Sequence, residues 1–175
     1  MLERILIAGS GGQGILLLGR ILARLAVDTV PHITFFPSYG AEVRGGTSNC
    51  QVILSSNEIA SPLAEKFDSL LIMNQQSLAR FRTGLVPGGM AVINQSLCQT
   101  SREKRFILVR ATEIADQLGN TRAANFVMLG AWIAHKPLIP VLAVEKLIVK
   151  SFPNAKPAIL KTNLKAFQIG LKHRA

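Results

Sequence analysis

The sequence predicts an α/β fold in a single domain, and three observations support this fold class. Residues 3–8 form an apolar run typical of a buried strand, residues 9–14 form a glycine-rich turn, and residues 15–26 form an apolar helix. Short strand-like segments follow, and helical patterns occupy the end of the chain. Strand, glycine turn and buried helix in this order are typical of α/β proteins. We therefore expect one Rossmann-like three-layer domain over residues 1–175, with a mostly parallel sheet and a helix-rich C-terminal part.

The further elements follow from apolar runs bounded by turn residues. The first helix carries Arg20 and Arg24 one turn apart, which gives it a single polar stripe. A turn is expected at Pro87-Gly88-Gly89 before the next strand. The further strands are expected at residues 32–36, 47–55, 69–74, 90–94 and 106–109. The further helices are expected at residues 75–82, 112–118, 123–134, 141–150 and 157–171.

The last of these helices has an apolar stripe bordered by lysines. The residues expected to face the core are Leu160, Leu164, Phe167 and Leu171. The lysines beside them are Lys161, Lys165 and Lys172. This pattern predicts an amphipathic helix with a basic face, which we expect to be solvated or turned toward another subunit rather than to bind a ligand.

The composition excludes two classes of protein and favours an assembly. Hydrophobic residues make up 49% of the chain and charged residues 17%, which is too apolar for a disordered protein. The longest apolar run, residues 15–27, contains two arginines, so no membrane span is expected. Met1 leads straight into a strand-like segment, which predicts a cytoplasmic protein without a signal peptide. The apolar composition also suggests surface buried against partners, with a homodimer of the isolated chain left open.

The net charge of +10 is unevenly distributed along the chain. Residues 1–100 carry seven basic and six acidic side chains, whereas residues 101–175 carry thirteen basic and four acidic ones. A basic half of this kind attracts nucleic acid, a phosphorylated cofactor or an acidic protein. Aromatic residues make up 6% of the chain and do not interleave with the basic ones, so a nucleic-acid-binding protein is disfavoured.

Cysteine and histidine usage predicts no metal or iron–sulfur site in this chain. Cys50 and Cys98 form no CxxC pair and cannot supply the four thiolates that a cluster needs. His32, His135 and His173 are scattered and have no companions at metal-ligand spacing.

The glycine-rich turn matches the GxGxxG spacing of dinucleotide-binding folds at Gly9, Gly11 and Gly14. Glycines let the backbone approach a phosphate, and the following helix offers free N–H groups to it. No carboxylate stands at the end of the second strand to bind a ribose, since residues 35–38 read Phe-Phe-Pro-Ser, and this argues against an NAD-dependent oxidoreductase. A turn without a ligand is the alternative, although the Gln13 amide could bond to a ligand or a partner.

A second unusual segment is the central loop with the strand that it opens, residues 37–52. It reads Pro-Ser-Tyr-Gly-Ala-Glu-Val-Arg-Gly-Gly-Thr-Ser-Asn-Cys-Gln-Val and holds the only tyrosine of the chain. Open α/β sheets usually place their sites on loops of this kind. A surface loop with a solvated pair of Glu42 and Arg44 is the alternative, but loops that only connect elements are usually shorter.

Together, the two segments resemble the gamma subunits of 2-oxoacid:ferredoxin oxidoreductases. The first motif is Gly-Ser-Gly-Gly-Gln-Gly-Ile at residues 9–15, and the second is Pro-Ser-Tyr-Gly-Ala-Glu-Val-Arg-Gly-Gly-Thr-Ser-Asn at residues 37–49. A weaker third match is Asn-Phe-Val-Met-Leu-Gly at residues 125–130. The resemblance covers most of the chain and implies that residues 1–175 form one pyruvate/ketoisovalerate oxidoreductase gamma-type domain.

The resemblance implies an accessory subunit of an oxidoreductase. Enzymes of this family convert a 2-oxoacid, coenzyme A and oxidised ferredoxin to an acyl-coenzyme A, carbon dioxide and reduced ferredoxin. Thiamine diphosphate, Mg²⁺ and iron–sulfur clusters are expected in the alpha, beta and ferredoxin-like partner subunits, and the gamma subunit lies near where coenzyme A enters. The second motif is similar to the 2-oxoglutarate branch first and the branched-chain (2-oxoisovalerate) branch second. A purely structural scaffold without ligand contact is the further alternative.

The motifs define a set of residues that we expect to bind a ligand or to line a subunit interface. Phosphate binding or loop ordering is expected mainly from Arg44 and the glycine turn. No catalytic and no metal-binding residue is expected. The set comprises Gly9, Gly11, Gly12, Gln13, Gly14, Ser38, Tyr39, Glu42, Arg44, Gly45, Gly46, Thr47 and Asn49, with Asn125 as a weaker member.

Overall fold

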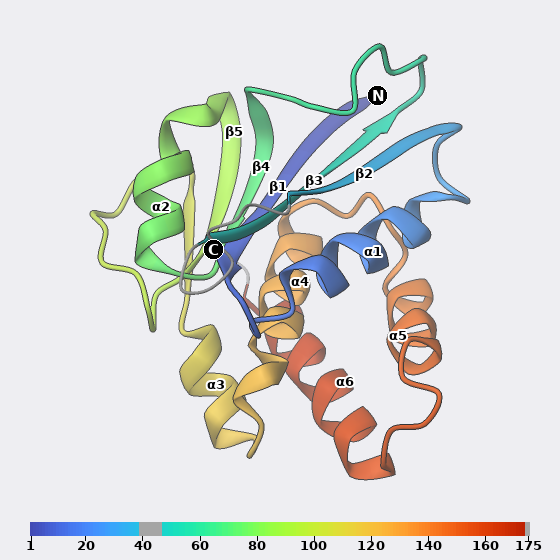
Figure 1. Ribbon diagram of the computed structural model, residues 1–175. Coiled ribbons are helices and arrows are strands. Elements are labelled where there is room, and N and C mark those ends of the chain that lie inside the picture. The colour runs from blue at the N-terminus through green and yellow to red at the C-terminus, as the bar shows by residue number, and fades with distance from the viewer. Residues whose placement is uncertain (39–46, 174–175) are drawn as a thin grey trace.

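The computed structural model of the chain describes residues 1–38 and 47–173, and its centre is a six-stranded sheet (Figure 1). The strands are β1 (Leu2–Ser10), β2 (His32–Ser38), β3 (Thr47–Ser55), β4 (Phe67–Ile72), β5 (Leu85–Asn94) and β6 (Phe106–Val109). Their order in the sheet is β2-β3-β1-β4-β5-β6. β1, β4, β5 and β6 pair in parallel, whereas β3 lies antiparallel between β1 and β2. Five of the six strands therefore point the same way, and the predicted mostly parallel sheet is confirmed.

Helices cover both faces of the sheet, so the predicted three layers are present (Figure 1). The helices are α1 (Ile15–Ala26), α2 (Gln75–Phe81), α3 (Ala111–Gln117), α4 (Ala124–His135), α5 (Val141–Lys150) and α6 (Pro157–Leu171). On one face, α1 packs on β1, β2 and β3, while α4 packs on β5 and β6. α5 and α6 pack on α1 and α4 from outside, and α2 lies on the other face against β1 and β4.

The first strand shows how the sequence specifies these layers. Ile5 and Ile7 belong to the core shared with α1 and α4, whereas Leu6 and Ala8 belong to the core under α2. Successive side chains of a strand point to opposite faces, and all four side chains are fully buried. A strand buried on both faces needs an unbroken apolar run, which is why this segment is apolar throughout.

Most element bounds agree with the sequence-based expectation, but the turn at Pro87-Gly88-Gly89 is wrong. β5 already begins at Leu85, which pairs with Phe67 of β4, and the three residues lie inside the strand. Gly88 has a φ of 79°, and the register against β4 shifts next to Phe67. The proline and glycine therefore mark a bulge within a strand rather than a turn before it.

The apolar stripe expected on α6 is also partly wrong. Its buried residues are Asn163, Ala166, Phe167 and Gly170, whereas the three leucines of the stripe are half-buried. The cause is a close crossing with α4, where a Cβ on Gly130 would overlap the Phe167 carbonyl oxygen. A Cβ on Gly170 would likewise overlap the backbone of α4. Small residues therefore form the contact line, and the leucines flank it.

Candidate functional site

The glycine loop, residues 9–14, connects β1 to α1 at the carboxyl end of β1. Gly12 and Gly14 have φ angles of 85° and 74°, a left-handed conformation that other residues rarely adopt. A Cβ on Gly9 would lie 2.5–2.8 Å from three neighbouring side chains. Gly11 differs, because no atom of residues 1–38 or 47–173 lies within 4 Å of the place where its Cβ would stand. The fold itself therefore requires three of the four glycines and leaves Gly11 without a structural reason.

Side chains of the same chain hold the glycine loop in place. Gln13 Oε1 accepts a hydrogen bond from the Ser10 backbone N–H at 2.7 Å, which closes the loop on itself. Asn74, which follows β4, donates from Nδ2 to Ser10 Oγ at 2.5 Å. Asn74 Oδ1 also caps α2 by accepting from Ser77 N at 2.9 Å. Since the Gln13 oxygen is used inside the loop, a contact of this amide with a ligand or partner would depend on its nitrogen.

The third sequence motif lies directly against the glycine loop. Asn125, in the first turn of α4, is 2% exposed and donates from Nδ2 to the Gly14 carbonyl oxygen at 3.5 Å. A side chain on Gly14 would collide with this amide. Asn125 Oδ1 is buried and accepts no hydrogen bond from the described part of the chain, which is uncommon for a buried polar atom. The structure therefore brings the first and third motifs together across 111 residues of sequence.

A cleft of about 700 Å³ opens beside the glycine loop. Its walls are the loop and α1, Phe152 with the first two turns of α6, and the connection from α3 to α4. Arg122 on that connection is exposed and also lines a smaller hollow of about 180 Å³ with Gly12 and Thr112. Open α/β sheets bind ligands outside the carboxyl ends of their strands, where the glycine loop lies. A hollow of about 710 Å³ lies at the opposite end of β1 and contains none of the predicted residues.

The cleft combines features that suit an anionic ligand with an apolar part. The first N–H groups of α1 have no intrahelical partners, and α1 has neither a side-chain cap nor an acidic residue in its first turn. No carboxylate within the first turn of α1 therefore neutralises the positive end of its dipole. Arg122 adds a guanidinium at the rim, and Phe126 packs edge-to-face on Phe152 at 6.0 Å to form an apolar wall. Such a cleft suits a ligand that carries phosphate beside an apolar chain.

Sequence reasoning missed Arg122 because no motif contains it. Asn120 is the signal that could have found it, since an asparagine before a helical segment is a typical N-cap. Its Oδ1 accepts from Arg122 N at 3.2 Å and starts the 3₁₀ turn that leads into α4. Asn163 of α6 was missed as well, because it belongs to no motif, yet it is buried and lines the cleft.

The central loop emerges beside the glycine loop. Ser38 is the last residue of β2, and Thr47 is the first residue of β3 and pairs with Ser10 in the ladder between β1 and β3. Asn49 is 8% exposed and lies opposite Ser38. The ends of the loop therefore lie at the same edge of the sheet as the glycine loop. The other predicted residues of this segment lie outside the described residues: Tyr39, Glu42, Arg44, Gly45 and Gly46.

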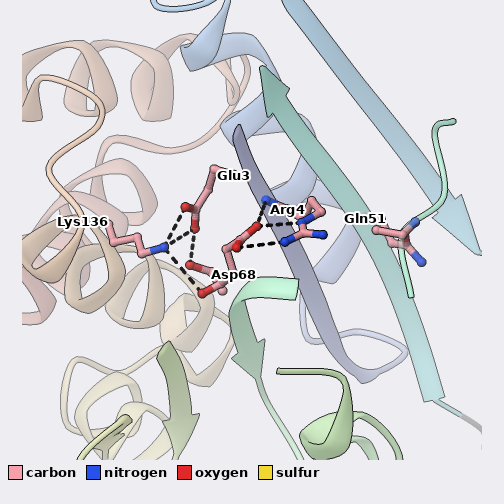
Figure 2. A network of polar contacts seen from close by, with 7 residues as sticks. Glu3, Arg4, Gln51, Asp68 and Lys136 are labelled. Atoms are coloured by element: carbon pink, nitrogen blue, oxygen red, sulfur yellow. Dashed lines mark hydrogen bonds and ion pairs between the residues drawn. The ribbon is translucent and has the colours of Figure 1, made fainter. Parts of the chain in front are cut away.

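A polar network occupies the opposite end of β1 (Figure 2). Glu3 is buried and accepts hydrogen bonds from Lys136 Nζ at 2.6 and 2.7 Å and from Ser69 Oγ at 2.6 Å. Arg4 donates to Asp68 through Nε at 2.8 Å and Nη2 at 3.1 Å. Burial would raise the pKa of Asp68, but the hydrogen bonds from Arg4 outweigh burial and hold that pKa below its usual range. Because these groups satisfy one another, we assign them a structural role.

The two cysteines do not fit an iron–sulfur cluster. Cys50 Sγ donates to the Ile15 carbonyl oxygen at 3.5 Å under α1, whereas Cys98 is buried in the core under α2. Burial raises the pKa of both thiols to about 12. Within residues 1–38 and 47–173, no three His, Cys, Asp or Glu residues are grouped to hold a metal ion. The helices of these two ranges are all too short or too polar to cross a membrane.

Comparison with known proteins identifies the family. Residues 4–173 match the model of the family described as pyruvate ferredoxin/flavodoxin oxidoreductase. The chain belongs to this family. The resemblance that the glycine loop and the central loop carry is therefore confirmed, and so is the link to an oxidoreductase family.

Two relatives and one solved structure show which members of the pyruvate ferredoxin/flavodoxin oxidoreductase family are similar. The chain is 37% identical over 176 residues to the ketoisovalerate oxidoreductase subunit VorA of Methanothermobacter marburgensis, which covers 95% of this chain and 35% of that protein. It is 34% identical over 179 residues to the 2-oxoglutarate synthase subunit KorC of Methanothermobacter thermautotrophicus, with 96% and 93% covered. The keto/oxoacid ferredoxin oxidoreductase gamma subunit from Geobacter sulfurreducens has a TM-score of 0.80 at 28% identity, with 98% and 97% covered.

The relatives differ in how much of their own length the chain matches. The chain spans about a third of the VorA protein but nearly the whole of KorC and of the Geobacter gamma subunit. Relatives named for ketoisovalerate and for 2-oxoglutarate are similarly identical to it, so membership of the pyruvate ferredoxin/flavodoxin oxidoreductase family does not choose the substrate.

Proposed function

We propose that the chain is the gamma subunit of a 2-oxoacid:ferredoxin oxidoreductase complex that acts on 2-oxoglutarate. The complex converts the 2-oxoacid, coenzyme A and oxidised ferredoxin to acyl-coenzyme A, carbon dioxide and reduced ferredoxin. Likeness to KorC along nearly the whole of both chains supports a subunit of the 2-oxoglutarate type. Thiamine diphosphate, Mg²⁺ and the iron–sulfur clusters belong to the alpha, beta and ferredoxin-like subunits in this proposal. The two separately buried cysteines of this chain support that division.

Within the complex, we assign the cleft beside the glycine loop to coenzyme A. Coenzyme A carries phosphate groups on a long and partly apolar chain. The α1 N-terminus and Arg122 suit the phosphates, and the aromatic wall suits the remainder. Gly11, with open space where a side chain would stand, allows the backbone to approach a phosphate. The observation that carries the assignment is the meeting of the glycine loop, Asn125 and Arg122 on one cleft.

The residues of the cleft bind and orient a ligand but do not transfer protons. Among the described residues that line it, none is a carboxylate, a histidine or a cysteine. The side chains that carry polar groups are asparagines, a threonine and Arg122, none of which serves as a general acid or base near neutral pH. This supports an accessory subunit that shapes the coenzyme A side of a site whose chemistry lies in other subunits.

Two alternatives keep specific support. A branched-chain complex acting on 2-oxoisovalerate is favoured by the identity of 37% with VorA, compared with 34% for KorC. A purely structural scaffold is favoured by the hydrogen bonds of Gln13 and Asn74, because they order the glycine loop without any ligand.

The proposed function is tested on the complex purified through a tag on this chain. Viologen reduction is measured with 2-oxoglutarate, 2-oxoisovalerate and pyruvate, each with and without coenzyme A. We expect reduction to require coenzyme A and to show the highest kcat/KM with 2-oxoglutarate. A higher kcat/KM with 2-oxoisovalerate would assign the branched-chain alternative. Purification of the chain alone, or the failure of all three 2-oxoacids, would refute membership of such a complex.

A further inference from the structure

The outer side of α6 presents a row of basic side chains. Lys161, Lys165 and Lys172 are exposed, and Gln168 continues the row at spacings of four, three and four residues. Residues at these spacings share one side of a helix. We call these four residues the basic face.

The charge of the basic face is mostly uncompensated by the described residues around it. Residues 151–175 contain no Asp or Glu. Glu145 of α5 accepts a hydrogen bond from Gln168 Nε2 at 3.0 Å, and none of the three lysines forms an ion pair with an acidic residue of the described ranges. Like charges four residues apart weaken a helix. Lys161 and Lys165, which lie four residues apart, therefore repel each other, and no ion pair with a described residue offsets this repulsion.

The basic face also borders a hollow. A depression of about 650 Å³ is lined by Lys165, Gln168, Ile169, Leu171 and Lys172. Ile169 and Leu171 are half-buried, and at about 3.6 residues per turn they flank the strip formed by Lys165, Gln168 and Lys172. Half-buried apolar side chains beside charges that form no ion pair with the described residues are more typical of a protein–protein interface than of a solvated helix.

The charge and the side chains of this surface indicate which kind of partner it binds. A second copy of the chain would bring the same positive charges against it and be repelled. Nucleic acid is disfavoured because none of the described residues that line the hollow is aromatic and could stack on a base. An acidic protein surface complements the charge of the lysines, and apolar side chains beside its acidic groups can pack on Ile169 and Leu171. A lasting contact fits better than a brief electrostatic encounter, because apolar contacts contribute to affinity and not only to the association rate.

We propose that the basic face of α6 docks an acidic patch on a companion subunit of the complex. This proposal rests on the proposed function, since it takes the chain to be one subunit among several. Beyond the proposed function, it names the surface of this chain that binds one companion subunit. α6 suits this role because its close crossing with α4 at Gly130 and Gly170 holds its inner side rigidly and leaves the basic face outward.

Lysine labelling of the purified complex tests the proposal directly. The complex is acetylated with a water-soluble reagent, and each lysine is quantified by mass spectrometry relative to the same complex denatured in urea. We expect labelling of Lys161, Lys165 and Lys172 to fall at least roughly tenfold below that of the exposed Lys104. Full labelling of the three lysines in an active, intact complex would overturn the proposal while leaving the proposed function standing.

A matched pair of charge-reversal variants provides the second test. Lys165→Glu/Lys172→Glu changes the basic face, and Arg20→Glu/Arg24→Glu makes the same change of charge on exposed residues of α1. We expect the first complex to lose a companion subunit at about 0.15 M NaCl, with retention at least roughly tenfold lower than in the second. Equal salt tolerance of the two variants would contradict the proposal. Retention of DNA by the wild-type complex that the first variant loses would assign the basic face to nucleic acid instead.

Discussion

Lys136 donates from Nζ to both carboxylate oxygens of Glu3, at 2.6 and 2.7 Å, although 133 residues separate the two in the sequence. Lys136 follows the last residue of α4, and Glu3 lies near the start of β1, so the pair ties the helical layer to the sheet (Figure 2). Ser69 Oγ donates to the same carboxylate and accepts from Trp132 Nε1 at 2.9 Å. A buried charge is tolerated here because it is paired and hydrogen-bonded.

Replacement of Lys136 by methionine should therefore destabilise the fold strongly. The change leaves the Glu3 carboxylate buried without its cation, and removal of one partner of a buried pair costs roughly 3–5 kcal/mol. We expect the lower end of this range, because the Lys136 side chain is 22% exposed. Urea unfolding of the chain measures the loss. The double variant Glu3→Gln/Lys136→Met should recover most of it, and an equal loss in both variants would contradict the account.

The pair of Arg4 and Asp68 predicts how stability depends on pH. The pKa of Asp68 is lowered in the folded chain because hydrogen bonds from Arg4 outweigh its burial. A lowered pKa stabilises the fold fully above the unfolded value of about 3.9, and this stabilisation is lost as pH falls through the folded value. Urea unfolding between pH 7 and pH 3 should show a smaller decline for Asp68→Asn than for wild type. Asp28→Asn, which changes an exposed carboxylate, is the control and should show the wild-type decline. If Asp68→Asn also shows the wild-type decline, Asp68 does not contribute to the pH dependence of stability.

The crossing of α4 and α6 should tolerate no added methyl group. Gly130→Ala places a Cβ against the Phe167 carbonyl oxygen, which forces the helices apart. We expect a loss of about 1–3 kcal/mol in the free energy of unfolding. Gly11→Ala is the control, because its Cβ would meet none of the described residues within 4 Å, and a change of no more than about 0.5 kcal/mol is expected. Equal stability of the two variants would show that the crossing is looser than described.

Neither thiol should react in the folded chain. Burial raises the pKa of Cys50 and of Cys98 to about 12, so the thiolate fraction near pH 8 is about one in ten thousand. Titration with a chromogenic disulfide reagent should detect no thiol before urea is added and two afterwards. Rapid reaction of one thiol in the native chain would refute the burial of that cysteine and reopen a redox role for it.

Local patterns predicted most of the elements, while contacts between distant segments decided the rest. Helices at residues 15–26, 141–150 and 157–171 have the expected bounds because their apolar and polar positions alternate clearly. The buried side of α6 was predicted only in part, because Gly130, far away in the sequence, brings the helix backbones together and buries small residues beside Phe167. The bulge at Gly88 was read as a turn, because proline and glycine mark both features in a sequence.

The sequence predicted the residues of the candidate site that belong to motifs but not those outside them. The glycine loop and Asn125 were expected from their motifs, and the structure brings them into contact. Arg122 belongs to no motif, and only the path of the chain from α3 to α4 carries it to the cleft. A single exposed arginine cannot be distinguished from a solvated one until the fold around it is known.

The Michaelis constant for coenzyme A in complexes that carry changes at the cleft tests the central claim most directly. Removal of a charged hydrogen bond to a phosphate costs about 1.5–3 kcal/mol, so Arg122→Ala should raise this KM roughly tenfold or more with kcat little changed. Gly11→Ala should also raise the KM for coenzyme A, although we expect this variant to be about as stable as wild type. Arg20→Ala, which removes an exposed arginine from α1, should leave it unchanged. Unchanged KM values in fully assembled Arg122→Ala and Gly11→Ala complexes would contradict the claim and leave the chain a scaffold.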